Sequence, residues 1–132
     1  MRVLVDTSVW ASLFRRSGPP DPPGVRKLGA LLRGREELVL TGLILQEVLQ
    51  GFREEATFRT VAAHLESFPL LDSDRRAFVA AAALHRRCAA SGVSASTADC
   101  QIAAVAIRHG CHLLTADRDF ERIARLSPLR LA

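Results

Sequence analysis

Acidic side chains follow two strand-like runs that are far apart in this 132-residue sequence. Asp6 comes directly after the apolar run 3–5, while Asp117 and Asp119 come after the run 111–115. A short, continuous apolar run is typical of a strand that is buried on both faces of a parallel sheet. In open parallel sheets, ligands bind outside the carboxyl ends of the strands. We therefore expect these carboxylates to meet at one edge of one sheet.

Helix capping is the alternative explanation for the same residues. Asp is a favoured N-cap residue, so Asp6 alone fits that role about as well as a functional one. Either Asp117 or Asp119 would equally suit the cap of the helix that follows them. Capping explains one carboxylate of this pair, however, and leaves the other without a role.

Asp99 opens a helical segment that is apolar on nearly every side. It shares one stripe with Ile102, Ala103 and Ala106, which lie three, four and seven residues further along the chain. A carboxylate on an inward stripe must be paired, hydrogen-bonded or bound to a metal ion. The helix dipole also favours an acidic residue in the first turn, but the inward phase favours a functional role.

Glu47 lies within an apolar helical segment that follows the second predicted strand. Its helix should therefore begin at the sheet edge where Asp6 lies. On its own, Glu47 fits a solvated helix face that it shares with Gln46 and Gln50. Its assignment to a site depends on the other carboxylates.

Several carboxylates packed together repel one another and raise one another's pKa, so such a cluster usually requires cations. Oxygen ligands without Cys or His suit the hard ions Mg²⁺ and Mn²⁺. The implied chemistry is in-line attack on a phosphodiester by a water that the metal activates. A Mg²⁺-dependent phosphatase is a weaker alternative, because Ser8 stands where that enzyme would need a second acid. A regulatory RNA-binding module is the other alternative, but without metal its carboxylates would repel phosphate.

Composition limits the remaining classes of protein. Hydrophobic residues make up 48% and charged residues 24% of the chain, as in ordinary globular proteins. The net charge of +4 gives mild support for a nucleic-acid partner. Three cysteines without a CxxC pair argue against a disulfide framework and a zinc ribbon. No apolar run approaches the length of a membrane span, so we expect a soluble, cytoplasmic protein that forms one domain over residues 1–132.

Predicted strands and helices alternate along the chain, which is typical of a three-layer α/β/α fold with a central, mainly parallel sheet of four or five strands. The predicted strands are 2–5, 37–41, 69–71, 111–115 and 129–131. The predicted helices are 7–16, 25–33, 43–52, 54–67, 74–91, 97–109 and 117–125. Residues 17–24 hold four of the six prolines, which cannot continue a helix, and predict an exposed loop.

Four segments of the chain, in this order, resemble the PIN-domain family, and within it the VapC toxins of bacterial and archaeal toxin–antitoxin pairs. The segments are 3–10, 46–51, 98–104 and 113–120. The resemblance implies a central parallel sheet flanked by helices and an endoribonuclease that cuts structured RNA such as tRNA or rRNA. It also implies a homodimer and a small VapB-type antitoxin that inserts a peptide near the active site, often with an arginine against the acidic cluster.

The resemblance further implies roles for individual residues. The acidic quartet that binds one or two Mg²⁺ or Mn²⁺ ions would be Asp6, Glu47, Asp99 and Asp117. Asp119 would be an auxiliary ligand, and the hydroxyls of Ser8 and Thr115 would orient the substrate or the ligands.

Overall fold

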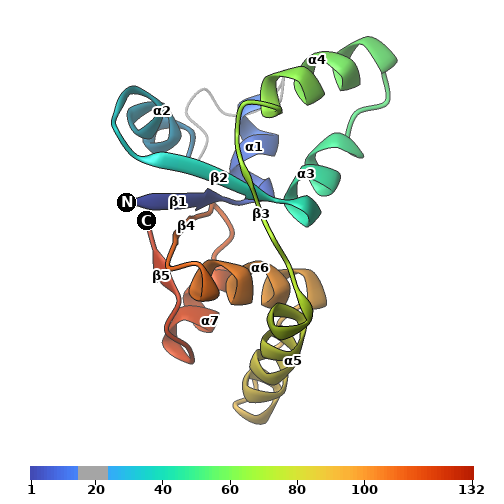
Figure 1. Ribbon diagram of the computed structural model, residues 1–132. Helices are drawn as coiled ribbons and strands as arrows, with labels where there is room; N and C mark the ends of the chain where they lie inside the picture. Colours follow the sequence, from blue (N-terminus) through green and yellow to red (C-terminus); the bar gives the residue numbers. More distant parts are fainter. Residues whose placement is uncertain (15–23) are drawn as a thin grey trace.

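The computed structural model of the protein describes residues 1–14 and 24–132. Within them, a five-stranded sheet has the strand order β3-β2-β1-β4-β5, and each pair of neighbouring strands is parallel (Figure 1). Its strands are β1 (Arg2–Val5), β2 (Glu37–Thr41), β3 (Leu70–Leu71), β4 (His112–Leu114) and β5 (Arg130–Leu131). The predicted α/β fold with a central parallel sheet is therefore confirmed.

Helices cover both faces of this sheet. The helices of the described residues are α1 (Thr7–Phe14), α2 (Val25–Arg33), α3 (Gly42–Leu49), α4 (Glu55–Leu65), α5 (Arg75–Ala90), α6 (Thr97–Arg108) and α7 (Asp119–Arg125). The chain steps from β1 through β2 to β3 and then returns to β4 on the other side of β1. Because parallel crossovers are right-handed, α1 to α4 lie on one face and α5 to α7 on the other (Figure 1).

The third helix ends earlier than predicted. The prediction extends it over 43–52, whereas α3 ends at Leu49. The N–H groups of Gly51 and Phe52 instead donate to the backbone oxygens three residues before them, at 3.3 Å each. Hydrogen bonds that span three residues, and not four, tighten the last turn of a helix and end it. Gly51 and Phe52 therefore belong to the turn that leads into α4.

Other boundaries shift by one or two residues. The last helix begins at Asp119 and not at Asp117, because Asp117 remains in the turn after β4. Residues 15 and 16 of the predicted first helix, and residues 17–23 of the loop predicted over 17–24, lie outside the described residues.

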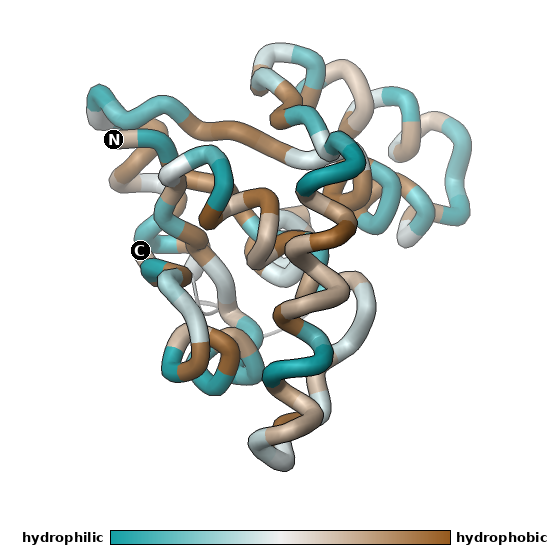
Figure 2. The backbone as a smooth tube through the Cα atoms, turned by 60° about the horizontal axis from the view of Figure 1, so that its bottom comes forward, coloured by the Kyte–Doolittle hydropathy of each residue, from teal (hydrophilic) through white to brown (hydrophobic). Residues whose placement is uncertain are grey.

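The central strand β1 lies in the middle of the core. Val3, Leu4 and Val5 are 0% exposed, because β2 and β4 flank this strand and helices cover both of its faces. The indole N–H of Trp10 donates to the backbone oxygen of Val5 at 3.1 Å, so this buried ring also satisfies its polar atom. Figure 2 shows apolar stretches of backbone along the central strands and hydrophilic stretches at many of the outer turns.

The helix α6 is apolar on nearly every side because it contacts α5, α7 and β4. Its residues 102–106 are all buried. Its first turn faces the carboxyl edge of the sheet, so this rigid element fixes whatever side chain projects from that turn. None of the helices in the described part of the chain is long and apolar enough to cross a membrane.

Truncation of the central strand tests this account of the core. We expect Leu4→Ala to lower the free energy of unfolding by about 2–5 kcal/mol, because it leaves a cavity in the centre of the protein. Leu32→Ala is the control, since Leu32 on α2 is 50% exposed, and it should change the free energy by less than about 0.5 kcal/mol. Urea denaturation followed by circular dichroism measures both values. Equal losses for the two variants would contradict the central position of β1.

Candidate functional site

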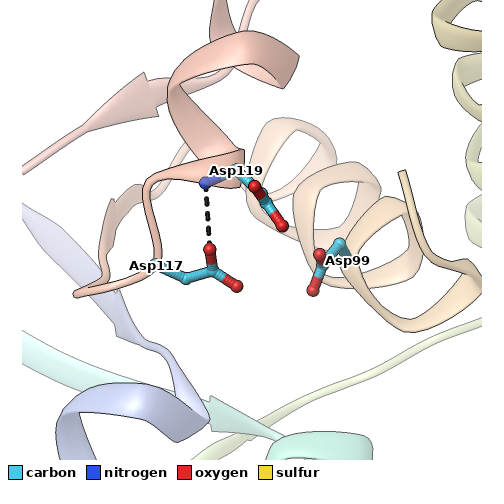
Figure 3. A group of neighbouring side chains, drawn as sticks. All are labelled: Asp99, Asp117 and Asp119. Carbon is cyan, nitrogen blue, oxygen red and sulfur yellow. Dashed lines mark hydrogen bonds between the residues drawn. The ribbon is translucent and has the colours of Figure 1, made fainter. Parts of the chain in front are cut away.

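Three of the predicted site residues converge at the carboxyl edge of the sheet. Asp117 and Asp119 follow β4, and Asp99 lies in the first turn of α6. One carboxylate oxygen from each lies within 4.8 Å of the others, and Figure 3 shows the three side chains gathered around a common space. Asp99 is half-buried, whereas Asp119 is exposed. A ligand can therefore reach this acidic cluster from the solvent.

Asp6 lies at the end of β1 and is only 4% exposed. Its Oδ2 accepts two hydrogen bonds, from the hydroxyl of Ser8 at 2.7 Å and from that of Thr115 at 2.8 Å. Its backbone N–H donates to the oxygen of Leu114 at 2.9 Å, which continues the pairing of β1 with β4 beyond the strands. Hydrogen bonds to an ionised group are strong, so the buried carboxylate of Asp6 is held in one position.

Ser8 and Thr115 join the ends of β1 and β4 through their hydroxyl groups. Each hydroxyl donates its single proton to Asp6. The two hydroxyl oxygens therefore lie 3.3 Å apart without a hydrogen bond between them. Each oxygen also accepts a backbone N–H at 3.0 Å, Ser8 from Ala116 and Thr115 from Asp117. The turn that carries Asp117 is thus tied to the two hydroxyls that hold Asp6.

The structure largely separates helix capping from the carboxylates of the site. Ser96 caps α6 by accepting the N–H of Asp99 at 3.0 Å, so the carboxylate of Asp99 is not the cap. The backbone oxygen of Asp6 accepts the N–H groups of Val9 and Trp10 in the first turn of α1, while its carboxylate accepts the hydroxyl protons of Ser8 and Thr115. Asp117 is not the N-cap of α7 either, but its Oδ1 accepts the N–H of Asp119, the first residue of that helix, at 2.9 Å, and its second oxygen points toward Asp99 (Figure 3).

Glu47 lies at the flank of the site, on α3. It is half-buried, and its Oε1 accepts the hydroxyl proton of Thr7 at 2.9 Å. Glu47 is not one of the three carboxylates whose oxygens lie within 4.8 Å of one another, so it would reach a shared ligand only from the α3 side. Thr7 is not among the predicted site residues. Its position between Asp6 and Ser8, at the start of α1, is the only signal in the sequence for this contact.

The described part of the chain offers no ion pair to the acidic cluster. No Lys, Arg or His of the described residues forms an ion pair with Asp99, Asp117 or Asp119. The pKa of Asp99 is raised to about 6, mainly by partial burial and also by the negative charges of Asp117, Asp6 and Asp119. A hydrogen bond with Ser96 lowers this pKa and partly offsets the increase. A divalent cation would relieve this repulsion, and an all-oxygen donor set fits Mg²⁺ or Mn²⁺.

The raised pKa of Asp99 predicts how the stability of the metal-free protein changes with pH. The pKa of this carboxyl is about 6 in the folded protein, against 3.8 for an ordinary Asp. Its protonation therefore stabilises the fold below about pH 4, and this contribution is lost as the pH rises through about 6. We expect Asp99→Asn, which cannot ionise, to match the wild type near pH 4. At about pH 7.5 the variant should be more stable, by on the order of 1 kcal/mol after allowance for solvent screening.

The matched control is Asp72→Asn, because Asp72 is exposed and lies outside the cluster. Urea denaturation in EDTA at several pH values measures the free energy of unfolding of all three proteins. A difference between Asp99→Asn and the wild type that stays constant with pH would contradict the electrostatic explanation.

Sequence comparisons agree on one family. The profile of the PIN domain matches residues 3–126. VapC ribonuclease Mb1587 of Mycobacterium bovis and ribonuclease VapC11 of Mycobacterium tuberculosis are each 35% identical to this chain over 132 residues. The matched region covers 98% of this chain and 97% of each relative.

Solved structures show the same fold. VapBC2 from Rickettsia felis, bound to a DNA fragment from its promoter, matches 100% of this chain and 98% of its own with a TM-score of 0.80 and 16% identity. VapBC-1 from nontypeable Haemophilus influenzae matches 100% of this chain and 97% of its own with a TM-score of 0.77 and 18% identity. Together with the sequence comparisons, these matches show that the chain belongs to the PIN-domain family and, within it, to the VapC group.

Proposed function

We propose that this protein is a metal-dependent endoribonuclease and the toxin of a toxin–antitoxin pair. The observation that carries the proposal is the acidic cluster of Asp99, Asp117 and Asp119, whose oxygens lie within 4.8 Å of one another. Like charges this close repel one another and favour the binding of a cation, and none of the described basic residues forms an ion pair with them. Relatives that are 35% identical over nearly the whole chain are named VapC ribonucleases, which supports the activity.

The acidic cluster would hold a Mg²⁺ or Mn²⁺ ion, with Asp6 and Glu47 beside it. When bound, the metal supplies positive charge that activates water and stabilises the attacking and leaving oxygens of the phosphodiester. The chain itself supplies rigid positions for the carboxylates. The hydroxyls of Ser8 and Thr115 hold Asp6, and the hydroxyl of Thr7 holds Glu47.

The charge distribution suits an RNA substrate. Five of the 14 acidic residues belong to the proposed site, which leaves nine elsewhere against 18 basic residues. The rest of the molecule is therefore strongly basic and attracts the RNA backbone. The acidic cluster without metal would repel the phosphate to be cut, so the local charge would make cleavage depend on the metal. A structured RNA of the tRNA or rRNA class would be the substrate.

The proposed partners are a VapB-type antitoxin and a second copy of this chain. The structural neighbours from Rickettsia felis and Haemophilus influenzae are VapBC complexes, which supports a partner of the VapB type. An arginine of the antitoxin would place a guanidinium among the unpaired carboxylates, where the electrostatic attraction is strongest. Such an arginine would occupy the position that the metal needs.

Substitution of Asp6 separates activity from folding. We expect Asp6→Asn to lower the rate of RNA cleavage by more than about 100-fold. Thr115→Val should lower it by about 10- to 100-fold, because it removes a hydrogen bond that orients Asp6. Gel analysis of end-labelled RNA in Mg²⁺ measures the rates, with Asp72→Asn as the control. A folded Asp6→Asn protein that cleaves RNA at the wild-type rate would refute the proposed site.

Removal of the metal tests the cofactor. EDTA should stop cleavage, and added Mg²⁺ or Mn²⁺ should restore it. Isothermal titration with Mn²⁺ should detect binding to the wild type and weaker binding to Asp117→Asn, because one oxygen ligand loses its charge. Cleavage that persists in EDTA would argue against metal dependence. Absence of both Mn²⁺ binding and cleavage would instead favour a regulatory RNA-binding module.

A further inference from the structure

A separate cleft lies on the α3 side of the site, between the end of α1 and the turn from α3 to α4. Its volume is about 210 Å³, and it is lined by Phe14, Gly51, Phe52, Arg53, Glu54 and Thr57. We propose that this aromatic cleft binds an unpaired nucleobase of the RNA substrate, a few nucleotides from the phosphodiester that is cut. The proposal rests on the endoribonuclease function proposed above.

The aromatic cleft continues a path that begins at the site. The helices α1 and α3 leave the same edge of the sheet, since β1 and β2 are parallel neighbours. They meet near the site through the 2.9 Å hydrogen bond from Thr7 to Glu47. Beyond the end of α3, Phe52 in the following turn contacts Phe14 at the end of α1, with ring centroids 6.2 Å apart and planes at 74°.

The length of this path fits a short piece of single strand. Thr7 and Phe14 are seven residues apart and lie on the same face of α1, which separates them by about 10 Å along the helix. That distance is roughly three bases at the 3.4 Å rise of stacked nucleotides. An RNA strand that passes Thr7 and Glu47 at the flank of the site can therefore place a base roughly three nucleotides further along in the aromatic cleft.

The two phenylalanines give the aromatic cleft a stacking surface in a fixed position. Phe14 and Phe52 are both half-buried, so part of each ring remains accessible. Phe14 stacks on Trp10 with a centroid distance of 6.2 Å and an interplanar angle of 12°, and Trp10 packs against Phe68 at 5.2 Å. Trp10 is 2% exposed, so the core holds the aromatic rings in place before a base arrives.

Arg53 and Glu54 add opposite charges to the aromatic cleft. Both are exposed, and neither takes part in an ion pair among the described residues. Glu54 stands at the N-cap of α4, but its side chain accepts no hydrogen bond from that helix, so its oxygens are available to a ligand. Arg53 suits a phosphate. Glu54 suits an exocyclic amino group, which adenine, cytosine and guanine carry and uracil lacks.

A nucleotide matches this combination better than an apolar peptide does. A nucleotide brings a flat ring, an amino group and a phosphate together, and the aromatic cleft offers a partner to each. An apolar peptide would bury the same rings but would offer no partner to Arg53 or Glu54, so it would use only part of the aromatic cleft. The expected preference is therefore for adenine, cytosine or guanine over uracil at one position near the cut.

Cleavage of an RNA library with a randomised loop, followed by sequencing of the cut ends, tests the proposal. The wild type should disfavour uracil at one position within roughly three nucleotides of the cut. Phe52→Ala should raise the KM for a preferred substrate by about 5- to 100-fold with little change in kcat, because stacking stabilises substrate and transition state alike. Glu54→Gln should lose the discrimination against uracil at that position only, since an amide both donates and accepts.

Matched controls come from α4 and from the residue that follows it. Phe58→Ala and Glu66→Gln remove an aromatic and an acidic side chain that are exposed and lie outside the aromatic cleft. Both should keep the wild-type KM and base preference. Circular dichroism checks the folding of Phe52→Ala. Because Glu54 is exposed, Glu54→Gln tests the aromatic cleft without disturbing the core.

The possible outcomes distinguish the aromatic cleft from the nuclease site. Unchanged KM and base preference in both variants would overturn the proposal while the nuclease function stands. If the wild type cleaves no RNA in Mg²⁺ or Mn²⁺, the proposed function fails, and selection of the same library by binding, with sequencing of the bound RNA, still tests the base preference. Variants that lose affinity for a VapB-type antitoxin but keep the wild-type RNA preference would assign the aromatic cleft to protein docking and overturn the proposal.

Discussion

The buried carboxylate of Asp6 is the group on which the geometry of the site depends. A charge at the end of the central strand is unfavourable unless hydrogen bonds replace its lost water, and the hydroxyls of Ser8 and Thr115 provide them. The same two hydroxyls accept backbone N–H groups from the turn after β4. The stabilisation of one buried charge therefore also fixes the position of Asp117.

The fold holds together charges that repel one another. The helix α6 is fixed by its buried apolar residues, and the turn after β4 is fixed by hydrogen bonds, so Asp99 and Asp117 cannot move far apart to reduce their repulsion. This repulsion, together with partial burial, raises the pKa of Asp99. A cation from any source would resolve it, so a metal ion and a guanidinium from an antitoxin would compete for the same space. The activating metal ion and the inhibiting guanidinium would then both neutralise the same carboxylates.

The sequence predicts those features that depend on local patterns. The buried strands follow from continuous apolar runs, and the ends of α5 and α6 follow from Gly92 and Gly110, whose φ angles of 73° and 65° favour glycine. The inward direction of Asp99 follows from the helical period, and Ile102 and Ala103 on its stripe are 2% and 0% exposed.

Other features depend on contacts between distant segments and leave little trace in the sequence. Thr7 meets Glu47 across 40 residues, and the aromatic cleft depends on the contact between Phe14 and Phe52. The early end of α3 at Leu49 is set by the turn into α4. The double role of Asp117, as a turn residue and as part of the acidic cluster, also appears only in three dimensions.

The pairing of β1 with β4 has a consequence for synthesis of the protein. Asp6 is synthesised 109 residues before Thr115, whose hydroxyl holds its carboxylate. Closing so long a loop carries an entropic penalty, which is offset only when β4 pairs with β1 in the completed sheet. A growing chain would therefore carry no complete site until the segment that contains Thr115 and Asp117 has left the ribosome. A partner translated nearby would have that interval in which to be ready before the toxin becomes active.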